Sequence, residues 1–445
     1  MAEVQVPHSH IPYGKEGSGF YSDNHIACFN VVDAATPMAL NALEKVPVKS
    51  LNVPFVIADF GTADGGTSMI LLKKMIELLR VRHGKDLPVQ VVYEDQPVND
   101  FKSLFFRVQG LLSHAPPSYM QEFDNVYVLA SGTSFYSQCL PPGSLHFGMS
   151  FTAMHWLSTR PCRITGALHF TEITDYKEKA VFQAQAAKDW ETILLARAKE
   201  LRSGGRMVVI NLAIDKEGQS AGTTKNIKES VFHSFTKYWK EMATEGEITQ
   251  VGEHDFNKYW KQMVTEGEIT QVGEHDFNKY WKQIVTEGEI TQVGEPNFNK
   301  NWKQIVTEGE ITQEEFDNTN FNMYYRTVEE CSAPFCDPNS AVSKSGLKLL
   351  AIETKVVRCP FHEKWIKSGR KADQEAAADH ARRCVRSPRT WSNSTFLSGL
   401  DSSRSEEEKA AIVDKFFLKY EKAVASAPED HGVDFVHAYM DIEKV

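Results

Sequence analysis

The chain has 445 residues, a length that corresponds to two to four domains or to one large α/β unit with additions. Hydrophobic residues make up 42% and charged residues 24%, which excludes a collagen-like, coiled-coil or disordered chain as the main state. The formal net charge of −10 argues against a protein that binds the phosphate backbone of nucleic acids.

The N-terminus and the cysteines indicate the compartment. No basic stretch followed by an apolar run opens the chain, so no secretory leader is predicted. No run of about 18 apolar residues occurs, which predicts a soluble protein without a membrane span. The seven cysteines are an odd number without a CxxC pair, which fits a reducing compartment. We therefore expect the protein in the cytoplasm.

Short apolar stretches that end in acidic residues or glycine indicate buried parallel strands. The first is Pro54–Ala58, which leads through Asp-Phe-Gly into a helical stretch over 68–82. Further strands are predicted over 89–93, 126–129, 145–150, 205–210, 347–353 and 435–440. Seven strands with helices between them predict an α/β fold with a Rossmann-like, doubly wound and mostly parallel sheet.

The segment VIADFGTADGGTSM, which spans 56–69, has the features of a nucleotide-binding turn. Asp59 closes the strand, and Gly61, Gly65 and Gly66 precede the helix. Glycines at these places let the backbone approach a nucleotide-type ligand at the carboxyl end of the strand. The pattern is neither GxGxxG nor a P-loop, which argues against a dinucleotide or a triphosphate.

A second candidate site residue, Asp95, closes the next predicted strand in the sequence YEDQP. A carboxylate at the end of this strand can accept both hydrogen bonds of a ribose diol. This position therefore predicts an adenosyl ligand, and the alternative is a solvated carboxylate at a strand end.

A 21-residue unit is repeated in tandem over residues 235–318. The copies begin at Phe235, Phe256, Phe277 and Phe298, and each combines an amphipathic helix, a turn and a short extended piece. Their near-identity favours a recent duplication of one element of the host fold. The alternative is a small solenoid that is used for binding.

Five motifs occur in the order and spacing of the SABATH methyltransferases, which are named for salicylic acid, benzoic acid and theobromine. They are ADFGTADGG, EDQPVNDF, SGTSFYSQCLPPGSLHF, FTAMHWLS and LRSGGRMVV. The chain thus resembles this family over nearly its whole length. The resemblance implies a helical cap over the active site, S-adenosyl-L-methionine as cofactor, and methylation of the carboxylate of a small-molecule acid. Two alternatives stay open: methylation of a ring nitrogen or hydroxyl, and a non-catalytic scaffold that binds through the repeat array.

We predict a corresponding division of the chain. Residues 1–34 close over the cofactor, and residues 35–215 form the first part of the core with cap helices near 156–200. Residues 216–340 form a cap region that contains the repeats, and residues 341–445 complete the sheet. The expected partner is a small-molecule carboxylic acid or azole, with no nucleic acid and no membrane. Homodimerisation is common among the similar enzymes, so a homodimer is a further expectation.

The resemblance assigns cofactor contacts position by position. These are Tyr21, Asp59, Gly61, Thr62, Thr67, Asp95, Gln96, Ser134 and Phe135. It implies that Asp95 holds the ribose, that Gln96 lies beside it under the adenine, and that Ser134 and Phe135 hold the adenine by hydrogen bonding and stacking.

The resemblance assigns four residues to the methyl acceptor. These are Cys28, Thr152, His155 and Trp156, and the last two are predicted to be catalytic. Cys28 stands where many carboxyl-methylating members have a glutamine that grips the carboxylate, and Thr152 replaces a larger aromatic residue. A carboxylate is already ionised at neutral pH, so methyl transfer needs no general base. The indole N–H of Trp156 is expected to donate a hydrogen bond to the acceptor oxygen.

Two other sequence patterns are compatible with a bound metal ion. Some members of the family bind magnesium near a motif that resembles Thr319–Asn322, but the expected acid is Thr319 here. Cys331, Cys336, Cys359 and His362 have spacings that a zinc site tolerates, yet a predicted strand separates the two pairs. We therefore predict no metal site.

Overall fold

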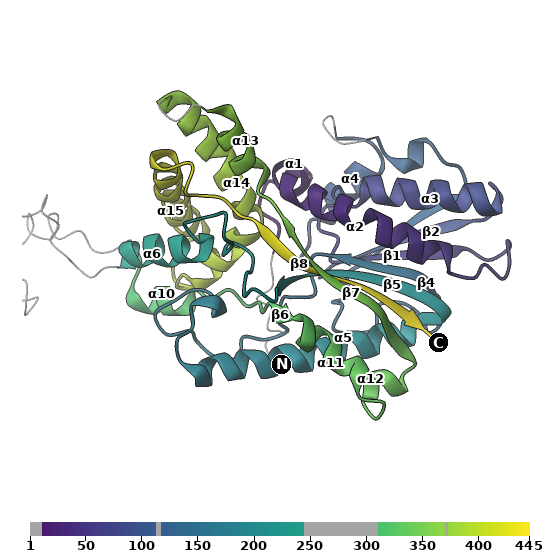
Figure 1. Cartoon of the computed structure of the whole chain (residues 1–445). Helices are drawn as coiled ribbons and strands as arrows, with labels where there is room; N and C mark the ends of the chain where they lie inside the picture. Colours follow the sequence, from purple (N-terminus) through teal and green to yellow (C-terminus); the bar gives the residue numbers. More distant parts are fainter. Residues whose placement is uncertain (1–10, 113–116, 244–309, 370–372) are drawn as a thin grey trace, which may run out of the picture. The chain divides into compact units, whose positions relative to one another are not determined.

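The computed structural model describes residues 11–112, 117–243, 310–369 and 373–445 (Figure 1). The chain divides into two compact units, of which one comprises Met1–Lys237 and Asp317–Val445 and the other Tyr238–Phe316. The first tandem copy begins within α6 (Val231–Ala243). The second and third copies lie wholly outside the described residues, and the fourth is described only from residue 310.

One sheet runs through the first unit. Its strands lie in the order β3 (Val126–Ser131), β2 (Val89–Glu94), β1 (Phe55–Phe60), β4 (Leu145–Phe151), β5 (Leu201–Ile214), β8 (Phe435–Lys444) and β7 (Leu347–Val357). The two-residue strand β6 (Arg326–Thr327) pairs with β5 off this path. Strands β1 to β5 pair in parallel, and β8 is antiparallel to β5 and to β7. The predicted doubly wound, mostly parallel sheet is confirmed, with one short strand added.

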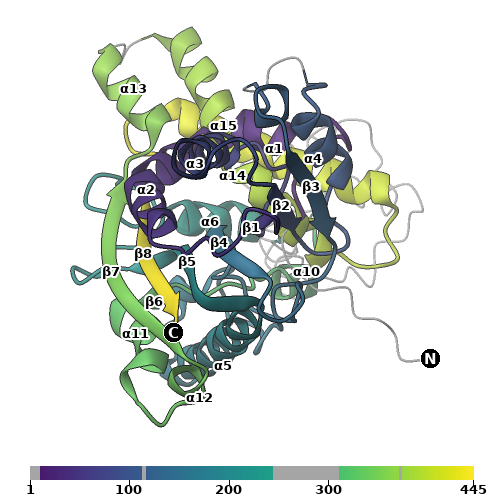
Figure 2. The ribbon, with the colours of Figure 1, turned by 90° about the vertical axis from the view of Figure 1, so that its right-hand side faces the viewer.

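The central strands are apolar because helices cover both faces of the sheet (Figure 2). Every residue of β1 and β4 is buried. One face packs on α2 (Ile26–Glu44) and α3 (Met69–His83), and the other packs on α5 (Tyr176–Glu200). This burial explains why the short apolar runs of the sequence predicted these strands correctly.

The other helices and the 3-10 turns complete the described elements. They are α1 (Phe20–Asn24), α4 (Phe101–Val108), α10 (Gln313–Asn318), α11 (Val328–Cys336), α12 (Ala341–Lys344), α13 (Pro360–Ser368), α14 (Gln374–Gly399) and α15 (Glu406–Ser426), with 3-10 turns η1 (Tyr119–Gln121) and η2 (Phe170–Glu172). Helices α14 and α15 pack on each other, with the Phe396 and Phe416 ring centroids 4.3 Å apart.

Helix α2 is long and apolar enough to cross a membrane by length and composition alone. Half of its most apolar stretch is buried inside the protein, where Val31, Ala35 and Ala39 pack into the core between α2 and the sheet. A core helix of this kind passes the same test as a membrane span. Its packing therefore accounts for its apolar sequence.

The strand order creates an opening next to β1. From β1 the chain proceeds through β2 and β3 to one side, and β4 and β5 lie on the other side. Loops that leave neighbouring strands in opposite directions open a crevice at the carboxyl ends of those strands. Gly61, Asp95 and Thr152 follow β1, β2 and β4, so the fold brings these predicted site residues to one edge of the sheet.

Candidate functional site

A cavity of about 1040 Å³, which includes space open to solvent, lies at this edge of the sheet. Sites for small molecules are usually concave and apolar with a few polar groups. Most of the predicted site residues line this cavity: Tyr21, Gly61, Thr62, Thr67, Asp95, Gln96, Ser134, Phe135, Thr152, His155 and Trp156. The structure thus brings residues from the regions of four of the five motifs, together with Tyr21, to one place.

The turn after β1 can be formed only with glycine at Gly61. Its φ of 74° lies in the left-handed region, and a Cβ atom there would come within 2.2 Å of the Ala153 side chain. The amide of Gly61 donates to the main-chain oxygen of Glu94 at 2.9 Å, which ties the turn to the end of β2. The backbone of this loop therefore forms part of the cavity wall.

Asp59 does not line the cavity but lies beneath this loop. Its carboxylate is buried and accepts hydrogen bonds from the Ser68 hydroxyl at 2.6 Å and the Thr62 hydroxyl at 3.0 Å. Burial raises the pKa of Asp59 to about 6, an effect that the hydrogen bonds from Ser68 and Thr62 partly offset. The structure thus places Asp59 where it orders the loop that lines the cavity.

Asp95 lines the cavity at the end of β2. One carboxylate oxygen accepts the Ala63 amide at 2.7 Å, and the other accepts the Gln96 amide at 2.8 Å. Burial raises the pKa of Asp95 to about 6, although these two hydrogen bonds lower it. A carboxylate offers about four acceptor positions, so each oxygen can accept one more hydrogen bond. This arrangement suits a diol.

The backbone of His155 and Trp156 is held by the segment around Met323. Trp156 and Met323 form an antiparallel bridge, and the Tyr324 amide donates to the His155 carbonyl at 3.0 Å. The hydroxyl of Tyr136 donates to the Trp156 carbonyl. Both predicted catalytic residues are therefore fixed at the cavity wall through their main chain.

The motif Thr319–Asn322, which raised the question of magnesium, braces this region. The side-chain amide of Asn322 donates to the Leu157 carbonyl at 2.9 Å, and the Asn320 side-chain oxygen accepts the Ile164 amide at 3.2 Å. Within the described ranges, no group of three or more His, Cys, Asp or Glu side chains is arranged to hold a metal ion. The two asparagines thus connect this motif to the chain that follows the predicted catalytic pair.

The rest of the cavity wall is largely aromatic. Phe232, Tyr325, Trp391 and Phe435 come from four distant segments, and none of them belongs to a predicted motif. Among the described residues that line the cavity there is no lysine and no arginine. A ligand there meets polar groups at the loops after β1 and β2 and apolar rings elsewhere.

Comparison with known proteins decides the family. Residues 9–278 match the model of the SAM dependent carboxyl methyltransferases. The chain belongs to this family. The predicted resemblance is confirmed, and with it S-adenosylmethionine as the cofactor of the family.

Similar proteins agree with this family. The chain is 31% identical to loganic acid O-methyltransferase of Catharanthus roseus over 221 residues, which are 45% of this chain and 56% of that protein. It is 25% identical to benzoic acid/salicylic acid carboxyl methyltransferase 2 of Petunia hybrida over 224 residues, 49% of this chain and 62% of that protein. The chain thus spans about half the length of the curated relatives it matches. A solved loganic acid methyltransferase with SAH has the same fold, with 18% identity and a TM-score of 0.60 over 97% of this chain and 98% of that one.

Cys28 is not among the residues that line the cavity. Its thiol is buried in α2 and hydrogen-bonded to the Thr67 side chain, and burial raises its pKa to about 12. His25, at the start of α2, lines the cavity instead, with Nδ1 3.2 Å from the Ser387 hydroxyl. The sequence places His25 only three residues before Cys28, but the exact start of the helix decides which of them reaches the cavity.

Cofactor affinity is expected to fall on acidification. The ionised carboxylate of Asp95 is the form that accepts hydrogen bonds. Burial raises the pKa of Asp95 and the pKa of Asp59 to about 6, and it also raises the pKa of Glu94. The affinity for the cofactor should therefore be highest at a pH above the raised pKa of Asp95 and should decline below it. Calorimetry with S-adenosylhomocysteine should show about tenfold weaker binding at about pH 5 than at about pH 7.5.

The folded protein is not expected to lose stability through these groups over that range. A buried acid whose pKa is higher in the folded state favours folding more as the pH falls through that pKa. The Asp95→Asn variant, which has no titratable group there, should show a smaller pH dependence. An affinity that stays constant between these two pH values in the native protein would contradict the prediction.

Proposed function

We propose that this protein transfers the methyl group of S-adenosylmethionine to the carboxylate of a small-molecule acid and forms a methyl ester. The observation that carries the proposal is that Asp95 and the His155–Trp156 pair line one continuous cavity. A carboxylate that can bind a ribose and an aromatic pocket that can bind the methyl acceptor thus line the same cavity, so cofactor and substrate can be bound there together. The family to which the chain belongs supports the same chemistry.

The residues at the loop end of the cavity fit an adenosyl cofactor. Asp95 has acceptor capacity for both ribose hydroxyls, and Gly61 lets the backbone approach without a side chain. Phe135 offers a ring face for the adenine beside Ser134. When bound, the cofactor supplies a methyl group that is activated by the positive sulfonium.

The residues at the aromatic end fit an acid with an apolar body. A carboxylate with a pKa of about 4 is ionised at neutral pH, so the protein need not remove a proton from it. The indole N–H of Trp156 is a donor only and can orient one acceptor oxygen. The rings of Phe232, Tyr325 and Phe435 exclude water from the acceptor, which strengthens such a hydrogen bond. The main contribution of the protein is therefore the orientation of the acceptor oxygen.

The proposal is tested by binding followed by turnover. Calorimetry with S-adenosylhomocysteine should show saturable binding. If no binding is seen, the proposed enzyme function is wrong and a non-catalytic binding scaffold is favoured. A panel of aromatic and terpenoid monocarboxylic acids, phenols and azoles is then incubated with methyl-labelled S-adenosylmethionine. Label that alkali releases as methanol identifies a methyl ester and supports the proposal. Alkali-stable label on an azole or phenol would instead establish N- or O-methylation.

A further inference from the structure

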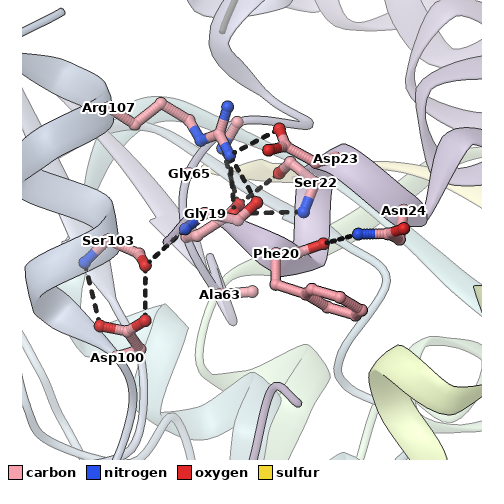
Figure 3. Close-up of polar contacts among 12 residues, drawn as sticks. Gly19, Phe20, Ser22, Asp23, Asn24, Ala63, Gly65, Asp100, Ser103 and Arg107 are labelled. Atoms are coloured by element: carbon pink, nitrogen blue, oxygen red, sulfur yellow. Dashed lines mark hydrogen bonds and ion pairs between the residues drawn. The ribbon is translucent and has the colours of Figure 1, made fainter. Parts of the chain in front are cut away.

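The segment before α2 supplies Tyr21 and His25 to the cavity wall, and one arginine of the core holds this segment. Arg107 lies in the last turn of α4 and is 1% exposed. Its Nη2 donates to the Gly19 carbonyl at 2.8 Å and to a carboxylate oxygen of Asp23 at 3.2 Å (Figure 3). The guanidinium therefore binds the segment at both ends of α1.

The same nitrogen also binds the loop that follows β1. Nη2 of Arg107 lies 3.0 Å from the carboxylate of Asp64, which is 2% exposed. This carboxylate accepts the Ser22 amide at 3.1 Å, the Ser22 hydroxyl, and the Gly66 amide at 3.2 Å. Asp64 thus connects the loop after β1 directly to the N-terminal segment.

The fit between these parts is close. A Cβ atom at Gly66 would lie 2.5 Å from the Ser22 hydroxyl and 2.7 Å from Nε of Arg107. Glycine at this position lets the arginine and the N-terminal segment reach Asp64 together. The loop, the segment and α4 therefore meet at a buried ion pair with little free space around it.

A second attachment holds only the beginning of the segment. Asp100, the N-cap residue of α4, accepts the Gly17 amide at 3.1 Å. The Ser103 hydroxyl accepts the Gly19 amide at 2.9 Å (Figure 3). These bonds do not involve the loop after β1. They anchor the chain before α1 and provide a contrast with the Arg107–Asp64 pair.

We propose that Arg107 and Asp64 are positioning residues that hold Tyr21 and His25 against the cofactor loop. The segment cannot hold itself, because α1 has five residues and isolated helices shorter than about 12 residues are marginal in water. Asp64 lies between Ala63 and Thr67, which line the cavity, so the pair fixes two adjoining parts of the wall. The kinetic part of this proposal rests on the methyltransferase function proposed above.

The pair acts on ligand binding more than on the chemical step. Without the ion pair, the segment with Tyr21 and His25 is no longer held in the cavity wall. Ligand binding must then order this segment, which lowers the affinity for the ligand. Once ligands saturate the site, the wall is again in place. KM for the cofactor and for the acid should therefore rise about tenfold, while kcat changes less than about threefold.

Two substitutions at Arg107 separate positioning from general structure. All three acceptors share the two N–H groups of Nη2, and a lysine ammonium has three N–H donors on its single nitrogen. Arg107→Lys should therefore keep the affinity for S-adenosylhomocysteine within about threefold, whereas Arg107→Met should lower it about tenfold. Asp64→Asn, which keeps the side-chain shape, should lower it similarly and serves if Arg107→Met does not fold.

A second readout needs no ligand. Lys15 is exposed in the segment just before Gly17, so trypsin cleavage after Lys15, identified by mass spectrometry, reports whether the segment is docked. Cleavage should be about tenfold faster in Arg107→Met and near the native rate in Arg107→Lys. A native protein that fails to bind S-adenosylhomocysteine would overturn the proposed function, yet this cleavage would still test the ion pair.

The matched control is Arg206→Met. Arg206 and Asp441 form another buried ion pair, 2.7 Å apart, on β5 and β8. Arg206 precedes the cavity residue Leu212 by six positions, about 20 Å along a strand. This variant should melt at a lower temperature with native affinity and native Lys15 cleavage. Native values in Arg107→Met, equal defects in Arg107→Lys and Arg107→Met, or equal defects in Arg206→Met would each overturn the proposal.

Discussion

Replacement of Asp95 by alanine is expected to weaken the binding of S-adenosylhomocysteine by about 100-fold. Each oxygen of this carboxylate already accepts one main-chain amide, from Ala63 or Gln96, and has capacity for one ribose hydroxyl. Hydrogen bonds to a charged acceptor contribute about 1.5–3 kcal/mol each. The loss of two of them, partly replaced by water, corresponds to ~3 kcal/mol, and isothermal calorimetry measures the change directly.

The control for this variant is Asp86→Ala, the same exchange at an exposed acid before β2. It should leave the affinity within about twofold of the native value, because a solvated carboxylate far from the ligand contributes little. Thermal melting of both variants separates loss of binding from loss of fold. An Asp95→Ala protein that melts near the native temperature and binds S-adenosylhomocysteine normally would remove Asp95 from the cofactor site.

The end of the cavity that we propose for the cofactor was predictable from the sequence, because its residues directly follow predicted strands. Parallel strands deliver their carboxyl ends to one edge of the sheet, so Gly61 and Asp95, each just after a predicted strand, had to lie near each other. The position of β8 between β5 and β7 was not readable, because strand order depends on contacts across the whole chain. Strand β6, with two residues, is too short to leave a pattern.

The acceptor end could not be read in the same way. Phe232, Tyr325, Trp391 and Phe435 are single aromatic residues in segments without a motif, and most aromatic residues serve the core. His25 lines the cavity in place of the predicted Cys28, and this depends on where α2 begins. Helix boundaries are the least certain part of a sequence-based prediction. The Arg107–Asp64 pair joins residues 43 positions apart, so only the folded chain reveals it.

Two buried acids, Asp59 and Asp64, hold the loop after β1. The carboxylate of Asp59 accepts hydrogen bonds from Thr62 and Ser68, and the carboxylate of Asp64 accepts one from Ser22 in the N-terminal segment. Both acids therefore act on the loop rather than on a ligand, although the loop itself lines the cavity. This division explains how a loop with three glycines can present a defined surface.

At the acceptor end, Trp156→Phe is expected to lower kcat/KM for the preferred acid by about 10- to 100-fold. The main chain of Trp156 is fixed by its bridge to Met323 and by the Tyr136 hydroxyl, so phenylalanine should occupy the same place. The exchange keeps an aromatic wall but removes the indole donor. One hydrogen bond to a charged acceptor contributes about 1.5–3 kcal/mol, which gives the expected range. The affinity for S-adenosylhomocysteine should stay within about threefold, because the cofactor contacts are elsewhere.

Trp365→Phe makes the same exchange at a buried tryptophan that does not line the cavity. It should change the melting temperature but leave kcat/KM within about twofold. Trp156→Ala should reduce kcat/KM further than Trp156→Phe, since it opens the wall to water as well as removing the donor. If Trp156→Phe kept native kcat/KM while Trp156→Ala lost it, the tryptophan would act through its bulk alone. Another group would then have to donate the hydrogen bond to the acceptor carboxylate, and His155 and His25, which also line the cavity, are the candidates.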